Sequence, residues 1–474
     1  MFVFLAQTSD KQAQEVIERG LELLSTPGGV GAVAVLTILL AGGVVTQSGW
    51  RWLLISLLVL ATLIQGSTKY FNNTLFPPLE QLRSGSQVLN ALVLAAIALA
   101  TSKKAGDSRW KLVGAIAIAM LCFELFFGLR LFFAGRALRG ALVLVMYVLL
   151  FVAIPVGVGR RLQKDEDFES LIRAIGLVGL PYILFNLLQY FYSPGQTVTH
   201  GRFAGVSGNP QSAGLIFSLL SITIIWLISR PRSSRWVLPA FLVAVGIGGL
   251  LLIWTGSRTS VLATAVGVAV MFRKRLGSMI LVGGFVLAAV FVASFFLADG
   301  EDILERVQST ENTRAAVWLV GLQEFLKYPI FGTLGMGDDA DLKVVESTPI
   351  QTLQVLGVVG FAFLFCVYLA IGSTMLRLLV LRKQSPKRGP LIDYVLGAWS
   401  TILIMSLFEA VFLGVITFFT ITIYLLATMS AYLLDPMTIE SQGFDEDEDE
   451  YEDEYEDEYE DEFEEMDDGH PSPA

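Results

Sequence analysis

The sequence predicts an all-α fold, a polytopic transmembrane helical bundle of about 12–13 spans with one large helical loop outside the membrane. Hydrophobic residues make up 54% of the chain and the mean hydropathy is +0.63, whereas soluble domains are roughly 45–50% apolar. The apolar residues form long blocks, and residues 279–298 contain no charged side chain. About 20 such residues cross a hydrocarbon core of about 30 Å as a helix. Because backbone polar groups cannot stay unpaired in lipid, repeated blocks of this kind indicate a helical bundle.

The pattern divides the chain into an N-terminal amphipathic segment, two groups of spans, a loop and a tail. These parts occupy 1–28, 29–298 (N-terminal bundle), 299–351 (large loop), 352–434 (C-terminal helices) and 435–474 (acidic tail). The candidate spans lie near 29–46, 50–66, 86–101, 111–130, 138–159, 169–192, 211–229, 236–255, 258–272, 279–298, 352–381, 391–412 and 414–434. The first two are short, so 12 spans fit as well as 13.

Lys and Arg alternate between the two sides of the predicted bundle. Basic loops occur at 102–111, 160–164, 230–235, 273–275 and 382–388, and poorly basic loops at 193–210, 256–258, 299–351 and near 413. Short cytoplasmic loops carry the excess of Lys and Arg. We therefore expect the first set, and the tail, to be cytoplasmic and the second set to face outward.

The outward loop 299–351 is the longest segment between spans. It contains an apolar-periodic stretch around 316–325, which predicts an amphipathic helix that ends before Pro329. An ordered outward segment of this length favours a functional site.

Charge and motifs narrow the function classes. The net charge of −11 arises from the tail, since residues 445–468 hold 19 of the 44 acidic residues. Such a like-charge block is typical of a solvated disordered tail, or of a dock for a basic cytoplasmic partner. The remaining basic excess fits cytoplasmic loops and gives no reason to expect nucleic-acid binding. The chain has no Walker, GxGxxG, GxSxG or HExxH motif, and its two cysteines have no zinc spacing. We expect no cofactor and no metal.

Three arginines lie in the otherwise poorly basic outward loops: Arg202, Arg258 and Arg314. Charge at the membrane boundary is costly and usually faces a cavity or a partner, and guanidinium groups fit phosphate oxygens in a two-pronged geometry. Together they predict a site for a lipid-linked pyrophosphate. Alternatively, each arginine extends to the interface or pairs with a nearby acid.

Several carboxylates and one histidine are further candidates. Glu346 precedes the span that starts near Thr352, where it is a candidate general base or an ordinary loop acid. His200 lies two residues from Arg202. Glu124 with Arg130, and Glu409, are intramembrane charges expected to form interior pairs or line a pathway.

Four segments resemble, in order, the motifs of the O-antigen ligase and polymerase superfamily of bacterial membrane proteins. RFAGVSGNP resembles its Arg-Phe-x-Gly…Asn-Pro motif and TGSRTS its Gly-Ser-Arg-Thr motif. TRAAVWLVGLQEFLKYPIFGTLGMG resembles the start of its large periplasmic loop, and IQTLQVLGVVG the span that follows. The matching residues are Arg202, Gly205, Asn209, Pro210, Ser257, Arg258, Thr259, Arg314, Trp318, Pro329, Gly332, Gly335, Gln351, Leu353, Gly357 and Gly360.

The resemblance implies an inverting, metal-independent glycosyltransferase in the bacterial inner membrane, with its active face in the periplasm. It would transfer or polymerise glycan from a polyprenyl-diphosphate carrier onto a glycan or lipid acceptor. Arg202, Arg258, Arg314 and Asn209 would bind the substrate, with Arg258 also assisting catalysis. Ligases of the family carry histidine where this chain has Glu346. Either Glu346 replaces that base, or the chain is a polymerase-like or exopolysaccharide enzyme.

Two functions of other classes remain open. A bundle with intramembrane charges also fits a transporter or flippase of a small solute or lipid-linked sugar, although no internal repeat is visible. A scaffold that uses the acidic tail is the third alternative.

Overall fold

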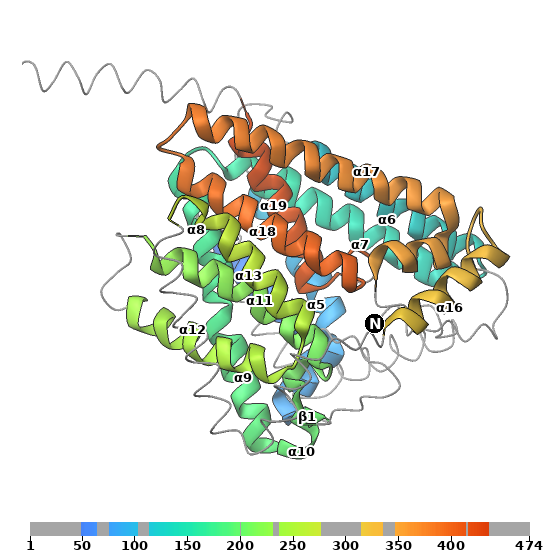
Figure 1. The fold of residues 1–474 in the computed structure, drawn as a ribbon, viewed down its shortest axis with the longest axis horizontal. Coiled ribbons are helices and arrows are strands. Elements are labelled where there is room, and N and C mark those ends of the chain that lie inside the picture. The colour runs from blue at the N-terminus through green and yellow to red at the C-terminus, as the bar shows by residue number, and fades with distance from the viewer. Residues whose placement is uncertain are drawn as a thin grey trace, which may run out of the picture.

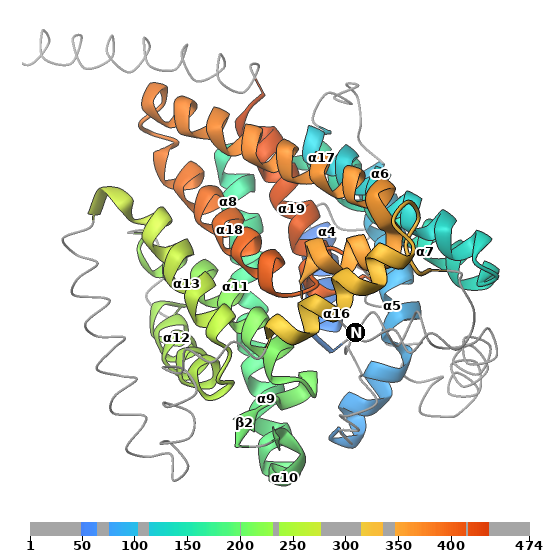
Figure 2. The same ribbon diagram turned by 45° about the vertical axis from the view of Figure 1, so that its right-hand side comes forward.

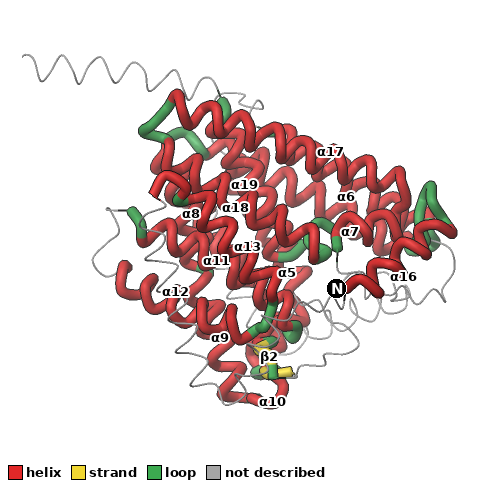
Figure 3. The backbone as a smooth tube through the Cα atoms, viewed as in Figure 1, coloured by secondary structure: helices red, strands yellow, loops and turns green. Residues whose placement is uncertain are grey.

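The computed structural model describes residues 49–63, 75–102, 113–199, 201–230, 237–275, 314–334, 347–413 and 416–435. Within these ranges the chain is helical almost throughout, with one short hairpin (Figures 1 and 3). Six described helices are long and apolar enough to cross a membrane, and five shorter ones are apolar. The predicted fold class is confirmed: the protein is an all-α, membrane-embedded multi-pass bundle.

The helices and strands follow the predicted order of blocks. They are α4 (Gly49–Leu63), α5 (Pro77–Ser102), α6 (Ala115–Phe133), α7 (Ala137–Phe151), η2 (Val152–Val158), η3 (Gly159–Arg161), α8 (Asp165–Leu177), α9 (Gly179–Tyr192), α10 (Pro194–Thr197), β1 (Val198–Thr199), β2 (Arg202–Phe203), η4 (Gly205–Ser207), α11 (Pro210–Ile228), α12 (Val237–Trp254), α13 (Arg258–Met271), η5 (Arg273–Arg275), α16 (Arg314–Lys327), α17 (Thr348–Gln384), α18 (Gly389–Phe408) and α19 (Phe418–Leu433). The predicted spans 29–46 and 279–298, the segment 1–28 and the tail from residue 436 lie outside the described residues.

One predicted span differs in detail from the observed helix, and the predicted amphipathic helix of the large loop is present. The span 138–159 runs through a π-helical segment, η2, that contains Pro155. Proline lacks an N–H and clashes with the carbonyl four residues earlier, so a locally widened helix accommodates it. The predicted amphipathic helix near 316–325 is confirmed as α16.

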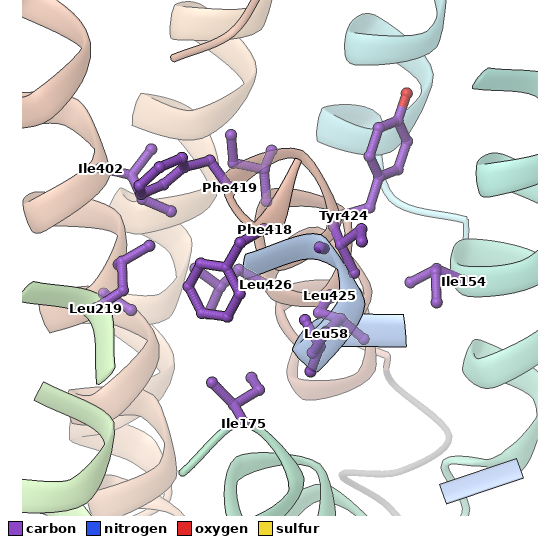
Figure 4. Close-up of a cluster of buried hydrophobic side chains, with 14 of the residues drawn as sticks. Leu58, Ile154, Ile175, Leu219, Ile402, Phe418, Phe419, Tyr424, Leu425 and Leu426 are labelled. Carbon is purple, nitrogen blue, oxygen red and sulfur yellow. The ribbon is translucent and has the colours of Figure 1, made fainter. Parts of the chain in front are cut away.

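Helix α19 occupies the centre of the bundle and is buried along almost its whole length. Its Phe418, Leu425 and Leu426 contact apolar side chains from five other segments (Figure 4). Those labelled are Leu58, Ile154, Ile175, Leu219 and Ile402. A helix that is apolar on every side is one that other helices surround.

Ion pairs join the basic loops at one end of the bundle, which we call the basic end. The pairs are Arg51–Asp167 (2.7 Å), Arg388–Asp165 (3.2 Å), Arg230–Glu169 (2.8 Å), Arg273–Asp393 (2.8 Å) and Arg382–Asp393. Asp165 and Asp167 lie in the first turn of α8, and Glu169 and Asp393 lie in the second turns of α8 and α18. Basic residues of four helix junctions therefore lie together, as the alternation of loops predicts.

The carboxylate of Asp393 holds two arginines of the basic end and is only 8% exposed. We expect Asp393→Asn to lower the free energy of unfolding by about 3 kcal/mol, because removing their shared partner leaves two partly buried arginines uncompensated. Thermal unfolding of the purified protein in detergent measures this. Glu324→Gln is the control, since the pair Glu324–Lys327 is exposed and such pairs contribute about 0–1 kcal/mol. Equal midpoints for the two variants would contradict the prediction.

Candidate functional site

The hairpin that follows α10 positions Arg202 at the end of the bundle opposite the basic end. Strands β1 and β2 pair with Thr199 opposite Arg202, and Gly201 makes the turn with φ +71°. The neighbouring Phe203 is buried and packs on Trp254, with ring centroids 5.3 Å apart. The hairpin is thus anchored by its phenylalanine, and His200 of the turn lies outside the described residues.

The glycines and Asn209 of the same segment have structural functions. Gly205 has φ +55°, and a Cβ there would lie 1.8 Å from Oδ1 of Asn186. That oxygen accepts a hydrogen bond from the Val206 N–H. The side chain of Asn209 caps α11 by accepting from the Gln211 N–H (2.9 Å), and Pro210 follows at the first helical position. Helix capping therefore accounts for Asn209, and its substrate-binding role stays a prediction.

Arg202 and Arg258 lie on two sides of one tight turn. The Arg202 Nε donates to the Thr255 carbonyl oxygen (2.7 Å). The next residue, Gly256, has φ +58° and allows the arginine to pass close to the backbone. Ser257 then caps α13, and Arg258 is the first residue of that helix. Two of the three predicted arginines are therefore brought together.

The starts of α11 and α13 lie next to each other beside this turn. A Cβ on Gly214 of α11 would come within 2.7 Å of the Ser260 hydroxyl and 3.0 Å of Ser257 Cβ. The Ser218 hydroxyl donates to the Ser260 carbonyl (2.8 Å). Helix N-termini carry partial positive charge and unpaired N–H groups. Because Arg202 contacts this turn and Arg258 follows it, this end of the bundle favours a bound anion.

Helix α18 ends at the end of the bundle where α13 begins. The two helices are antiparallel and in close contact: a Cβ on Gly267 would lie 2.0 Å from Thr401 Oγ1, which donates to the Ala263 carbonyl. Arg258 and Glu409 therefore lie at the same end of this pair. Glu409 caps the C-terminus of α18 and is 5% exposed, so it lies at the end of its span and not in the middle.

The start of α17 and the side of α16 meet the end of α18. The Thr348 hydroxyl donates to the Glu409 carbonyl (2.7 Å) and accepts from the Val411 N–H (3.0 Å). Trp318 of α16 stacks on Phe408, with centroids 6.2 Å apart. Figure 2 shows α16 crossing this end of the bundle. Helices α16, α17 and α18 therefore meet at the end of α18 that carries Glu409, a residue that the hydropathy pattern placed inside a span.

Of Arg314 only the backbone, and of Glu346 nothing, belongs to the described part of the chain. Arg314 begins α16, one turn before Trp318, and its side chain lies outside the described residues. Glu346 also lies outside them, directly before Ser347, the N-cap of α17. Helix α16 and the start of α17 both reach the end of the bundle where Arg202 and Arg258 lie.

Helix α17 is broken at Gly357, and the segment after α16 fills the break. The Val358 and Val359 N–H groups donate to the carbonyls of Pro329 and Ile330 (2.8 and 3.3 Å). In return, the Thr333 and Leu334 N–H groups donate to the carbonyls of Gln354 and Val355 (2.9 and 3.2 Å). Without these bonds, the backbone N–H and carbonyl groups at the break in α17 would be left unpaired. The motif residues around Pro329 and Gly357 thus hold the loop to the bundle.

Glu124 and Arg130 do not pair, contrary to one of the expectations from sequence. Arg130 Nη2 donates to the carbonyls of Phe331 and Leu334 (3.0 and 2.9 Å), which fastens the same segment to α6. Glu124 is fully buried and interacts electrostatically with Tyr147 and Tyr424. Figure 4 shows the Tyr424 hydroxyl directed away from the apolar cluster.

No protein-family model matches the chain, and no curated protein matches it either. Among the described residues, no group of three or more His, Cys, Asp or Glu side chains is arranged to hold a metal ion.

Proposed function

We propose that the protein is a membrane glycosyltransferase similar to O-antigen ligases and polymerases. It would take glycan from a polyprenyl-diphosphate carrier at the periplasmic face of a bacterial inner membrane, with the acidic tail in the cytoplasm. The observation that carries the proposal is the position of Arg202 and Arg258 on one turn, beside two helix N-termini and opposite the basic end. A diphosphate is the anion that a lipid carrier would present there.

The chemistry needs charge stabilisation at the leaving group and a base at the acceptor. An acceptor hydroxyl attacks the anomeric carbon, the bond from that carbon to the diphosphate oxygen breaks, and the polyprenyl diphosphate leaves with the electron pair. Arginines aimed at this oxygen stabilise the charge as it develops. The hydroxyl proton passes to a carboxylate, for which Glu346 is our first candidate and Glu409 the second. The acceptor is a glycan or a lipid.

Deletion of the gene, followed by electrophoresis of surface glycans, tests the proposal. Short or missing chains indicate polymerisation, and full-length chains that are not attached indicate ligation. Complementation with Glu346→Gln and Glu409→Gln at equal protein levels then identifies the base, since only the variant that lacks it loses polymer. Unchanged glycans in the deletion strain would reject glycan transfer.

A transporter is the second candidate, and the interior of the bundle favours it. The buried group of Glu124, Tyr147 and Tyr424 lies between α6, α7 and α19, and α17 is a broken helix. Intramembrane ionisable residues and broken helices are features of transporter pathways. Counterflow of solute into proteoliposomes that contain the purified protein would support this function, and the Glu124→Gln variant would then lose it.

A further inference from the structure

Helix α16 has one side packed on the bundle and two sides exposed. The packed side carries Trp318, which stacks on Phe408, and the buried Gly321. Of the exposed sides, one is polar: Gln323 is exposed, and Lys327 bonds Glu324 (2.6 Å). The hydrogen bond to the Glu324 carboxylate raises the pKa of Lys327, whose ammonium group is charged at neutral pH.

The other exposed side of α16 is entirely apolar. Leu319 is 59% exposed and Leu326 is 72% exposed, with Leu322 exposed between them. Residues spaced by three and seven lie on one face of a helix. This side is distinct from the packed side, so contacts within the bundle do not account for its leucines.

The apolar side of α16 continues into the surface that the spans present to lipid. Ile330 follows α16 and is 60% exposed. Its carbonyl accepts from the Val359 N–H, so it lies against the outer end of the main part of α17. That part of α17 exposes Val358, Phe365 and Leu369 along its length. In a membrane-embedded bundle, such a row of exposed apolar residues faces hydrocarbon.

A second contact extends this surface to α6. The Arg130 guanidinium lies over the ring of Phe331, 5.1 Å from its centroid. Phe331 is exposed, and so is Phe133 at the end of α6. Exposed apolar residues therefore occur on α16, on the turn 329–331 and on the parts of α6 and α17 that contact this turn.

We propose that α16 and the turn 329–331 bind the surface of the lipid bilayer at the end opposite the basic end. Leu319, Leu322 and Leu326 enter the interfacial region, while Lys327 stays at the level of the headgroups, where an ammonium group meets anionic lipid. A helix with one apolar and one charged side lies in the plane of a membrane interface. The binding holds the start of α16, and with it the backbone of Arg314, at headgroup depth. The inference does not depend on the proposed glycan transfer.

Spin-label accessibility measures the depth of α16. The native Cys122 and Cys366, both exposed, are replaced by alanine, and single cysteines are introduced at Leu326 and, as the matched control on the polar side, at Gln323. A label at Leu369 of α17 gives the hydrocarbon reference. The full-length protein is placed in nanodiscs of phosphatidylethanolamine and phosphatidylglycerol. Collisions with oxygen, which partitions into lipid, are compared with collisions with a water-soluble nickel chelate.

We expect the ratio of oxygen to nickel collisions at position 326 to exceed that at position 323 by about threefold and to approach the value at position 369. Equal ratios at 326 and 323 would place α16 in water and overturn the proposal. Protection of position 326 from both reagents would also overturn it, because a protein surface or a second copy would then cover the leucines. Size-exclusion profiles that match the parent protein show that each labelled variant is folded.

Discussion

Replacing Arg258 with alanine is expected to reduce glycan transfer by about 10²–10³-fold, because a preorganised cation at a developing negative charge contributes about that much. Arg258 opens α13 beside the turn that Arg202 contacts. We expect Arg202→Ala to cause a loss of the same order. The measurement is the rate of polymer formation from lipid-linked glycan in proteoliposomes, at equal amounts of folded protein. Arg258→Lys should recover only part of the rate, since lysine lacks the two-pronged geometry of a guanidinium group.

Two controls separate this effect from a general loss of positive charge. Arg173→Ala removes an exposed arginine at the basic end, where it pairs with Glu169 at 3.2 Å. Arg377→Ala removes an exposed arginine from the part of α17 near the basic end. Both variants should retain the parent rate. A rate for Arg258→Ala within twofold of these controls would remove the diphosphate site from the proposal.

The fold was predictable because two strong physical constraints act locally. Apolar blocks must be helical in lipid, and Lys and Arg collect on one side. Residues such as Arg230, Arg273 and Arg388 could therefore be assigned to a common end before any contact was known, and their ion pairs with Glu169, Asp393 and Asp165 agree with that assignment. Which side of the membrane this end faces stays a prediction.

The candidate site was predictable in part. The Asn-Pro sequence at 209–210 is also a helix-start signal, and capping is what the described structure shows for Asn209. Glu124 and Arg130 are six residues apart, a spacing that puts them on different faces of a helix, so their failure to pair could have been foreseen. The position of Glu409 at the end of α18 could not, because a hydropathy pattern locates helix ends only within a few residues.

The close approach of the segments around Gly332 and Gly357 could not be predicted from the sequence pattern, because these segments have no local relation. A Cβ on Gly357 would lie 2.3 Å from the Ile330 carbonyl oxygen, and one on Gly332 would lie 2.3 Å from the Val355 carbonyl carbon. Both glycines have positive φ. Each backbone therefore occupies the space that a side chain on the other would need, and this mutual approach creates the hydrogen bonds that fill the break in α17.

Replacing Gly357 with alanine should consequently be among the most destabilising single changes in the protein. Its φ of 67° and ψ of −165° lie in a region that only glycine adopts readily. Strain and the backbone clash together should cost about 3 kcal/mol or more, which lowers the thermal midpoint in detergent. Because the same bonds hold the segment after α16, the spin label at Leu326 should also become more mobile.

Gly372→Ala on the same helix is the matched control for this variant, since a Cβ there meets no atom within 4 Å. Alanine at that position should leave the midpoint unchanged or raise it, because glycine inside a helix is less favourable than alanine by about 1 kcal/mol. If Gly357→Ala is no less stable than Gly372→Ala, the break in α17 is not held by close backbone contact. The motif glycines would then need a direct role at the site. If it is markedly less stable, backbone geometry rather than chemistry explains why glycine is needed at position 357, and the arginines remain the proposed residues that act on substrate.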